Sequence, residues 1–339
     1  MRALRQRVSR ALRPAVDFLV RAQGSDGLWR DFPCFVGPSD EWVTAYVANA
    51  LLGISTQASE FSIGHACYAL QKRQRRAGGW AFNGDSPPDA DSTAWTYRLL
   101  TALGRSRWEC ALRARKFMAR HQRRDGGIVT YASPQPLKRK FARPSAWPTY
   151  SGWCVTDPCV TAASVVTLDP KGQRAARRFL LATQGGRCEW GGYWWGDYEY
   201  ATSLALDALR TVRGNAVAAC RESALQWMSQ RVAPSGSVFS PTLRRRSPFA
   251  TACALRSLRT FPSRQRNAWV SQCATWLIDN QGEDGAWRPS ATLRIPAPSD
   301  RYPEGLSGWG LGGAIGDVCL DANAVFTTAT VVAGLKLCL

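Results

Sequence analysis

Two carboxyl groups near residue 90 have the types and spacing that point most directly to chemistry. They lie in GGWAFNGDSPPDADSTAW, residues 78–95, where glycine and proline give way to an apolar run. Asp89 and Asp91 stand two residues apart at the start of a predicted helix. Two neighbouring acids can divide the roles of proton holder and charged neighbour. The competing interpretation is that both only start the helix and complement its dipole.

The elements that position these acids are repeats. A glycine-rich turn, in most copies ending in an aromatic residue, recurs at 23–29, 74–80, 121–127, 184–194 and 281–287, with a weaker copy at 233–239. Each copy follows one helical stretch and precedes a second, more apolar one. This period predicts about six helix–turn–helix units.

The apolar member of each pair is hydrophobic almost all round, so it must be buried, whereas its amphipathic partner, such as 106–122, faces water. Six hairpins side by side give an inner and an outer ring of helices. We therefore predict an all-α fold, a closed α6/α6 barrel, with residues 1–339 as a single domain. Two long insertions rich in proline and glycine, 132–153 and 291–316, are predicted loops at the mouth of this barrel.

Aligning the inner helices on Thr44, Thr93 and Thr161 separates ordinary acids from unusual ones. The column four residues earlier holds helix-capping residue types, which predicts N-caps; it contains Asp40, Asp89, Asp157, Asp197, Ser247 and Asp317. The column two residues before the threonine is mostly apolar; it contains Trp42, Asp91, Cys159, Glu199, Phe249 and Cys319. Asp91 and Glu199 therefore place carboxyl groups where the repeat favours apolar ones, and both are predicted to face the mouth.

The amino-acid composition limits the classes of partner that the protein is expected to bind. Lysine and arginine outnumber acidic residues by 44 to 25, a net charge of +19, which attracts phosphates and anionic lipid. The arginines follow the outer helices all around the ring, so no nucleic-acid groove is expected. No apolar run of about 18 residues exists. The basic first helix, with Leu4, Val8, Ala11 and Leu12 on one side, allows peripheral membrane contact.

The cysteines and histidines bear on location and metals. Eleven scattered cysteines without a CxxC pair are typical of reduced thiols and predict a cytoplasmic protein. The only histidines, His65 and His121, lie far apart, so no metal site is expected. A homo-oligomer is compatible with the sequence.

The acidic stretch and the turns together resemble a known family. GGWAF followed by PDADSTAW resembles the segment of squalene–hopene cyclases, and of class II terpene cyclases generally, that carries the DxDDTA motif; the turns resemble their QW motifs. The resemblance implies that Asp91 is the acid that protonates an alkene and that Asp89 is its ionised neighbour. Ser92 replaces the third acid, no histidine is apparent to hydrogen-bond Asp91, and one ring replaces the usual two or three helical domains.

The implied chemistry needs an apolar cavity with aromatic faces for a carbocation. The residues predicted to line it are Trp42, Tyr46, Trp95, Trp153, Trp195, Glu199, Phe249 and Trp309. The expected substrate is a linear isoprenoid such as farnesyl or geranylgeranyl diphosphate. Arg143, Arg244, Arg245 and Arg246 are candidates for its diphosphate, with solvated charge as the alternative. No cofactor is expected, and Mg²⁺ only if a diphosphate is bound.

Three other functions fit parts of the pattern. A barrel that only binds a lipid or a protein partner would keep the repeat and leave Asp91 without a role. A protein prenyltransferase β-subunit would use Asp317 and Cys319 as zinc ligands, but it needs a later histidine, and none follows His121. A glycan-active barrel would pair Asp91 with Glu199, and the repeated turns disfavour it.

Overall fold

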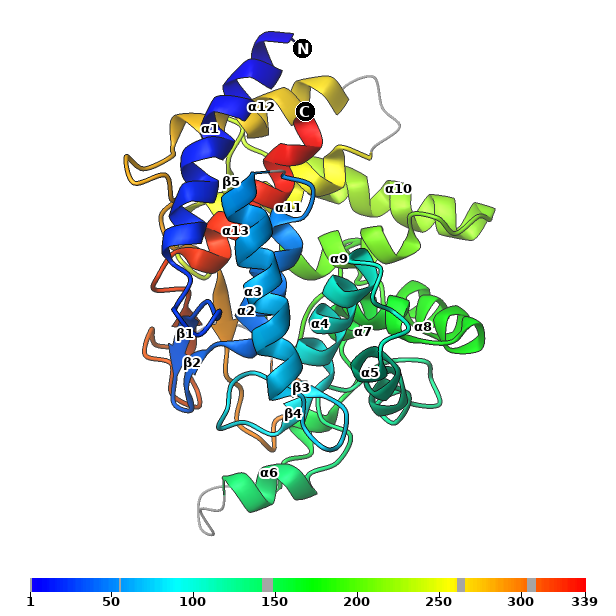
Figure 1. Ribbon diagram of the computed structural model, residues 1–339. Coiled ribbons are helices and arrows are strands. Elements are labelled where there is room, and N and C mark those ends of the chain that lie inside the picture. Colours follow the sequence, from blue (N-terminus) through cyan, green and yellow to red (C-terminus); the bar gives the residue numbers. More distant parts are fainter. Residues whose placement is uncertain (1, 55, 142–148, 261–265, 304–308) are drawn as a thin grey trace.

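Helices form nearly all the regular structure of the chain, seen in a computed structural model that describes residues 2–54, 56–141, 149–260, 266–303 and 309–339 (Figure 1). The outer helices are α1 (Arg2–Arg21), α3 (Gln57–Arg73), α5 (Glu109–Ala119), α8 (Pro170–Ala182), α10 (Asn215–Gln230) and α12 (Arg266–Asp279). The inner helices are α2 (Glu41–Leu51), α4 (Ala90–Ala102), α7 (Pro158–Ser164), α9 (Glu199–Leu209), α11 (Pro248–Leu258) and α13 (Val325–Leu335). The predicted all-α fold class is confirmed.

The inner helices contact one another in chain order. Helix α2 packs on α4, α4 on α7, α7 on α9, α9 on α11 and α11 on α13, and α13 packs back on α2. The two ends of the chain meet in the same way, since α1 lies beside α12 and α13 (Figure 1). Nearly every inner-helix residue is buried, as their uniform hydrophobicity predicts.

One threonine per inner helix ties that helix to the turn before it. Its hydroxyl accepts a hydrogen bond from the backbone N–H of the last turn residue, at 2.8–3.2 Å. The six threonines are Thr44, Thr93, Thr161, Thr202, Thr251 and Thr328. This contact fixes the register of each repeat. It confirms the alignment of the inner helices on Thr44, Thr93 and Thr161.

The turn itself is held by a glutamine and a tryptophan. The Gln184 amide donates to Cys188 O of its own turn and to Cys220 O of the next outer helix, both at 3.0 Å. Trp190 Nε1 donates to Leu180 O of the preceding outer helix at 2.7 Å. In the last copy, Gln281 donates to Ala11 O of α1, so the same contact joins the end of the chain to its beginning.

The N-cap predictions are partly right. Asp89, Asp157 and Ser247 cap α4, α7 and α11 through side-chain hydrogen bonds. Asp40 precedes α2, but its carboxylate binds Arg73 instead. The predictions for Asp197 and Asp317 were wrong. Asp197 accepts from Thr242 Oγ1 at 2.6 Å, and Asp317 lies eight residues before the first residue of α13.

Four short antiparallel hairpins, which the sequence analysis did not predict, precede four of the inner helices. They pair β1 (Asp31–Cys34) with β2 (Gly37–Ser39), β3 (Trp80–Ala81) with β4 (Pro88–Asp89), β5 (Val238–Ser240) with β6 (Arg245–Ser247), and β7 (Thr292–Arg294) with β8 (Val318–Leu320). They carry the chain from each turn to the start of its inner helix. Strand β4 thereby delivers Asp89 to the N-cap of α4.

The two insertions lie together at this end of the ring. The first contains the short helix α6 (Gln135–Lys140). Trp153 Nε1 at its end donates to Pro296 O of the second insertion at 2.9 Å, and Gly152 N donates to Pro298 O at 2.8 Å. The insertions are therefore bonded directly to each other.

The apolar face of α1 does not lie free for a membrane. Val8, Ala11 and Leu12 are buried, and α1 packs on α12 and α13, so the predicted membrane contact through this face was wrong. Within the described residues, no helix has the length and hydropathy needed to cross a bilayer.

Replacing Gln281 with alanine tests the contact that joins the chain ends. The variant loses two part-buried hydrogen bonds, to Ala11 O and Gly285 O. We expect unfolding to become easier by about 2 kcal/mol, measured by chemical denaturation. Asn280→Ala is the control, because Asn280 is exposed and bonds only within α12; equal effects of the two changes would contradict the role of Gln281.

Candidate active site

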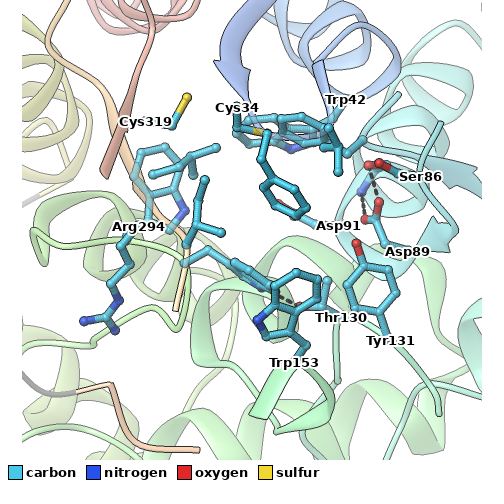
Figure 2. Close-up of a pocket in the computed structure, with 18 of the residues that line it drawn as sticks. Cys34, Trp42, Ser86, Asp89, Asp91, Thr130, Tyr131, Trp153, Arg294 and Cys319 are labelled. Carbon is cyan, nitrogen blue, oxygen red and sulfur yellow. Dashed lines mark hydrogen bonds between the residues drawn. The ribbon is translucent and has the colours of Figure 1, made fainter. Parts of the chain in front are cut away.

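An apolar cavity of about 110 Å³ lies at the end of the ring where the inner helices begin. Its walls come from the β1–β2 and β3–β4 hairpins, the first turn of α4 and both insertions. Figure 2 shows Trp42 on one wall and Trp153 opposite, with Asp89 and Tyr131 to one side and Arg294 to the other. Asp91 lines the same cavity.

Asp91 stands in the first turn of α4. Its Oδ1 is buried and has no hydrogen-bond partner, and the accessible part of the residue faces the cavity. Burial raises the pKa of Asp91 well above its ordinary value, and the charges of Asp89 and Asp157 raise it further. This environment therefore favours the protonated form of the carboxyl.

Asp89 is bound more tightly than Asp91. Its carboxylate accepts from Ser92 N at 2.7 Å and from Ser92 Oγ at 2.8 Å. Burial nevertheless raises the pKa of Asp89 to about 7, against the lowering effect of the bonds from Ser92. Ser92, where the resembled motif has a third acid, thus fixes the carboxylate that neighbours Asp91.

The threonine contacts show that the predicted column beside Asp91 was misaligned in two repeats. The residues two positions before the six threonines are Trp42, Asp91, Cys159, Tyr200, Phe249 and Phe326. Tyr200 and Phe326 take the places assigned to Glu199 and Cys319. Asp91 is the one acid in this column. Two of the aromatic residues in the column, Trp42 and Phe326, stack with their ring centroids 4.8 Å apart.

Glu199 therefore does not line this cavity, but it lines an adjoining groove. It lies one position earlier, where its carboxylate pairs with Arg231 Nε at 2.7 Å. Glu41 at the equivalent position pairs with Arg75 at 2.8 Å. Arg75 lies two residues after the end of α3, and Arg231 directly follows α10, so each pair joins the start of an inner helix to the end of the next outer helix.

The predicted aromatic residues divide into four groups. Trp42, Trp153 and Trp195 line the cavity. Phe249 is buried behind Trp195, with the two rings stacked at 5.2 Å. Tyr46 and Trp95 instead line a separate pocket with Arg98 and Arg256. Trp309 is half-buried and does not belong to the described lining of the cavity.

Three of the four predicted diphosphate ligands do not line the cavity. Arg143 lies outside the described residues. Arg244, Arg245 and Arg246 sit at the β5–β6 hairpin, where Arg245 donates to Pro289 O and Arg246 to Ser235 Oγ. The arginine that does line the cavity is Arg294, which donates to Gly192 O, Tyr193 O and Pro303 O.

A wider groove of about 1030 Å³ adjoins the cavity and shares Trp195 and Arg294 with it. Its charged residues are mainly arginines; they are Arg123, Arg187, Arg231, Arg294 and Arg301, against Asp125, Asp197 and Glu199. The groove is thus cationic where the cavity is apolar.

Several lining residues escaped the sequence analysis. Phe35, Phe82, Tyr131, Phe141 and Trp194 also face the cavity. Phe82 and Tyr131 each follow a glycine-rich turn within four residues, so an aromatic between a turn and its inner helix is the signal that would have found them. Within the described residues, no cluster of three or more metal-binding side chains occurs, and Asp317 with Cys319 forms no zinc site.

Comparisons with known proteins agree with this geometry. Scans of family models and of curated proteins give no match. Among solved structures, a protein from Actinoplanes is 36% identical over 97% of this chain and 99% of its own, with a TM-score of 0.91. The type II terpene cyclase MstE from Scytonema, in complex with geranylgeranyl dihydroxybenzoate, is 33% identical over 99% of both chains, with a TM-score of 0.93. A further MstE structure, 32% identical, contains its product, merosterolic acid A.

Ring, cavity and acid together define a helical terpene cyclase. The likeness to MstE over the whole chain goes further than the fold, and the chain belongs to the type II terpene cyclases; it is an enzyme. The ent-copalyl diphosphate synthase from Streptomyces platensis, 16% identical with a TM-score of 0.59, shares the fold over 88% of this chain and 50% of its own. An enzyme is favoured over a barrel that only binds.

Arg231→Met tests the role given to Glu199. The change leaves a buried carboxylate without its partner, so we expect the free energy of unfolding to fall by about 3 kcal/mol. The double variant Arg231→Met/Glu199→Gln should recover most of this loss, as measured by denaturant unfolding. Additive losses in the double variant would show that the two side chains are not coupled.

Proposed function

We propose that this enzyme cyclises a linear isoprenoid by transferring a proton from Asp91 to a terminal alkene. The single observation that carries the proposal is a buried carboxyl, without a partner on Oδ1, that faces an aromatic cavity. An alkene is a weak base, so its protonation needs an acid that is still protonated at neutral pH and is close to the reacting carbon. Burial keeps Asp91 in that form.

Asp89 is the ionised neighbour in this proposal. Both carboxyls have a raised pKa, but Asp89 is stabilised as an anion by two bonds from Ser92, whereas Asp91 has no such bonds on Oδ1. Asp89 therefore loses its proton first, and its charge disfavours a second charge on Asp91. The N-terminus of α4 offsets part of that effect when Asp91 becomes a carboxylate after transfer.

The cation that forms is guided by the walls. Trp42, Trp153 and Trp195 present aromatic rings to the cavity, and each can stabilise a desolvated cation by up to about 2 kcal/mol. Water is kept away by the apolar walls and by the two bonded insertions, so ring closure precedes quenching.

The substrate we propose is a prenyl chain with an anionic head group. A cavity of about 110 Å³ is smaller than the engineered cavity of ~150 Å³ that holds benzene, so a 15- or 20-carbon chain must extend beyond it. The adjoining groove, cationic and sharing Arg294, would take the head group. Farnesyl and geranylgeranyl diphosphates and geranylgeranyl dihydroxybenzoate all have this form.

The proposal is tested by incubating the enzyme with these three compounds, with and without Mg²⁺, beside Asp91→Asn. We expect a cyclic product from the wild type and a fall in kcat on the order of a thousandfold in the variant, because the amide cannot supply the proton. Thermal unfolding should occur at the same or a higher temperature, since the buried acid is removed. Equal rates of cyclisation would refute the role of Asp91, and uptake of a prenyl compound without turnover would favour a binding protein.

The pH profile gives a second prediction. Activity requires protonated Asp91, so kcat should be lost as pH rises through the raised pKa of this group. Asp89→Asn keeps an oxygen that accepts from Ser92 N but removes the charge that raises the pKa of Asp91. We expect the alkaline limb of the profile to move to lower pH. A limb that stays in place would show that Asp89 does not act on the acid.

A further inference from the structure

Two polar atoms on the cavity wall lack partners. Trp42 Nε1 and Asp91 Oδ1 are both buried without a hydrogen bond. Both residues line the cavity. They occupy the same position of the repeat on α2 and α4, which pack against each other. A buried donor and a buried acceptor left unsatisfied on one wall each cost free energy.

The chemistry of the two groups allows only one way to pair. An indole nitrogen donates and cannot accept. A protonated carboxyl has one oxygen that carries the hydrogen and one that only accepts. If Trp42 Nε1 donates to Oδ1, the acidic hydrogen must therefore be on Oδ2.

Other side chains near Asp91 cannot take this role. Ser92 donates to Asp89. Asp89 and Asp157 are acids whose charges oppose ionisation of Asp91. The Tyr200 hydroxyl is also buried without a partner, but Tyr200, unlike Trp42, does not line the cavity that Asp91 faces. Arg98 lowers the pKa of Asp91 through its charge alone, and it is bonded to Ala163 O and Asp207. The indole N–H of Trp42, which has no other partner, lowers the pKa of Asp91.

We propose that Trp42 is the positioning residue of the acid: its indole N–H holds Asp91 Oδ1 and thereby places the transferable hydrogen on Oδ2. This inference rests on the proposed function of Asp91. The hydrogen bond forms when substrate fills the cavity, because hydrogen bonds of catalytic groups are often long or poorly aligned in the unliganded enzyme. After proton transfer the same N–H stabilises the carboxylate, where charge develops. Trp42 thus takes the place of the histidine that the sequence lacks.

The first test removes the donor and keeps the ring. Trp42→Phe should lower kcat by about ten- to a hundredfold with a small change in KM, because loss of a donor to a developing anion acts on the transition state. The alkaline limb of the pH profile should move to higher pH. Trp42→His, which keeps a ring N–H, should recover part of the rate. Trp195→Phe is the matched control, since it also removes an indole from the wall and should leave the limb in place.

A spectroscopic readout works without turnover. A protonated, buried carboxyl gives a separate C=O band in the infrared, assigned here by its absence in Asp91→Asn. With a saturated 20-carbon isoprenoid alcohol bound, this band should move to higher frequency in Trp42→Phe, because the carbonyl oxygen loses its donor. If Trp42→Phe does not fold, benzothienylalanine at position 42 keeps the shape of indole without the N–H.

The outcomes separate the two proposals. No carboxyl band in the wild type near neutral pH would mean that Asp91 is ionised, and the proposed function fails. A band that Trp42→Phe leaves unmoved, or a pH limb that shifts equally in Trp195→Phe, would overturn the role of Trp42 and leave Asp91 as the acid.

Discussion

The candidate active site depends on the burial of one carboxyl group in an apolar cavity. Removing a carboxylate from water is costly, and the protein avoids most of that cost because Asp91 remains neutral. What keeps Asp91 neutral is local: no donor on Oδ1, and the nearby acids Asp89 and Asp157. Those two acids are themselves held by backbone N–H groups at the starts of α4 and α7. Asp89 and Asp157 therefore both cap helices and raise the pKa of Asp91.

The contacts that hold the repeat together leave the residue types that line the cavity free to vary. Its stabilising contacts, the threonine to the turn and the glutamine and tryptophan to the outer helices, lie away from the cavity wall. The second residue of each inner helix makes none of these contacts. It can therefore be Trp42, Asp91 or Phe249 without altering the ring. A carboxyl could be placed at one of six equivalent positions because the fold does not rely on that position.

Much of the fold, and part of the site, could be predicted from periodicity. The buried and half-exposed helices, three N-caps and the place of Asp91 all follow from local patterns. Glu199 was misplaced because the loop before α9 is one residue out of register. Asp317 was misplaced because strand β8 and the turn after it separate Asp317 from α13. Only the threonine contacts reveal these shifts. No local sequence pattern predicts the pairing of Glu199 with Arg231, because the two residues lie 32 positions apart in the chain.

The two insertions form part of the wall that closes the cavity. Loops of the ring itself contribute to this cover. Trp153 from one insertion and Ile295 from the other both line the cavity, and Trp153 is bonded to Pro296. Because the insertions are joined to each other as well as to the ring, they can act as one cover. A cover built from loops, rather than from a domain interface, lets the prenyl end of a substrate be enclosed while its head group stays in the adjoining cationic groove.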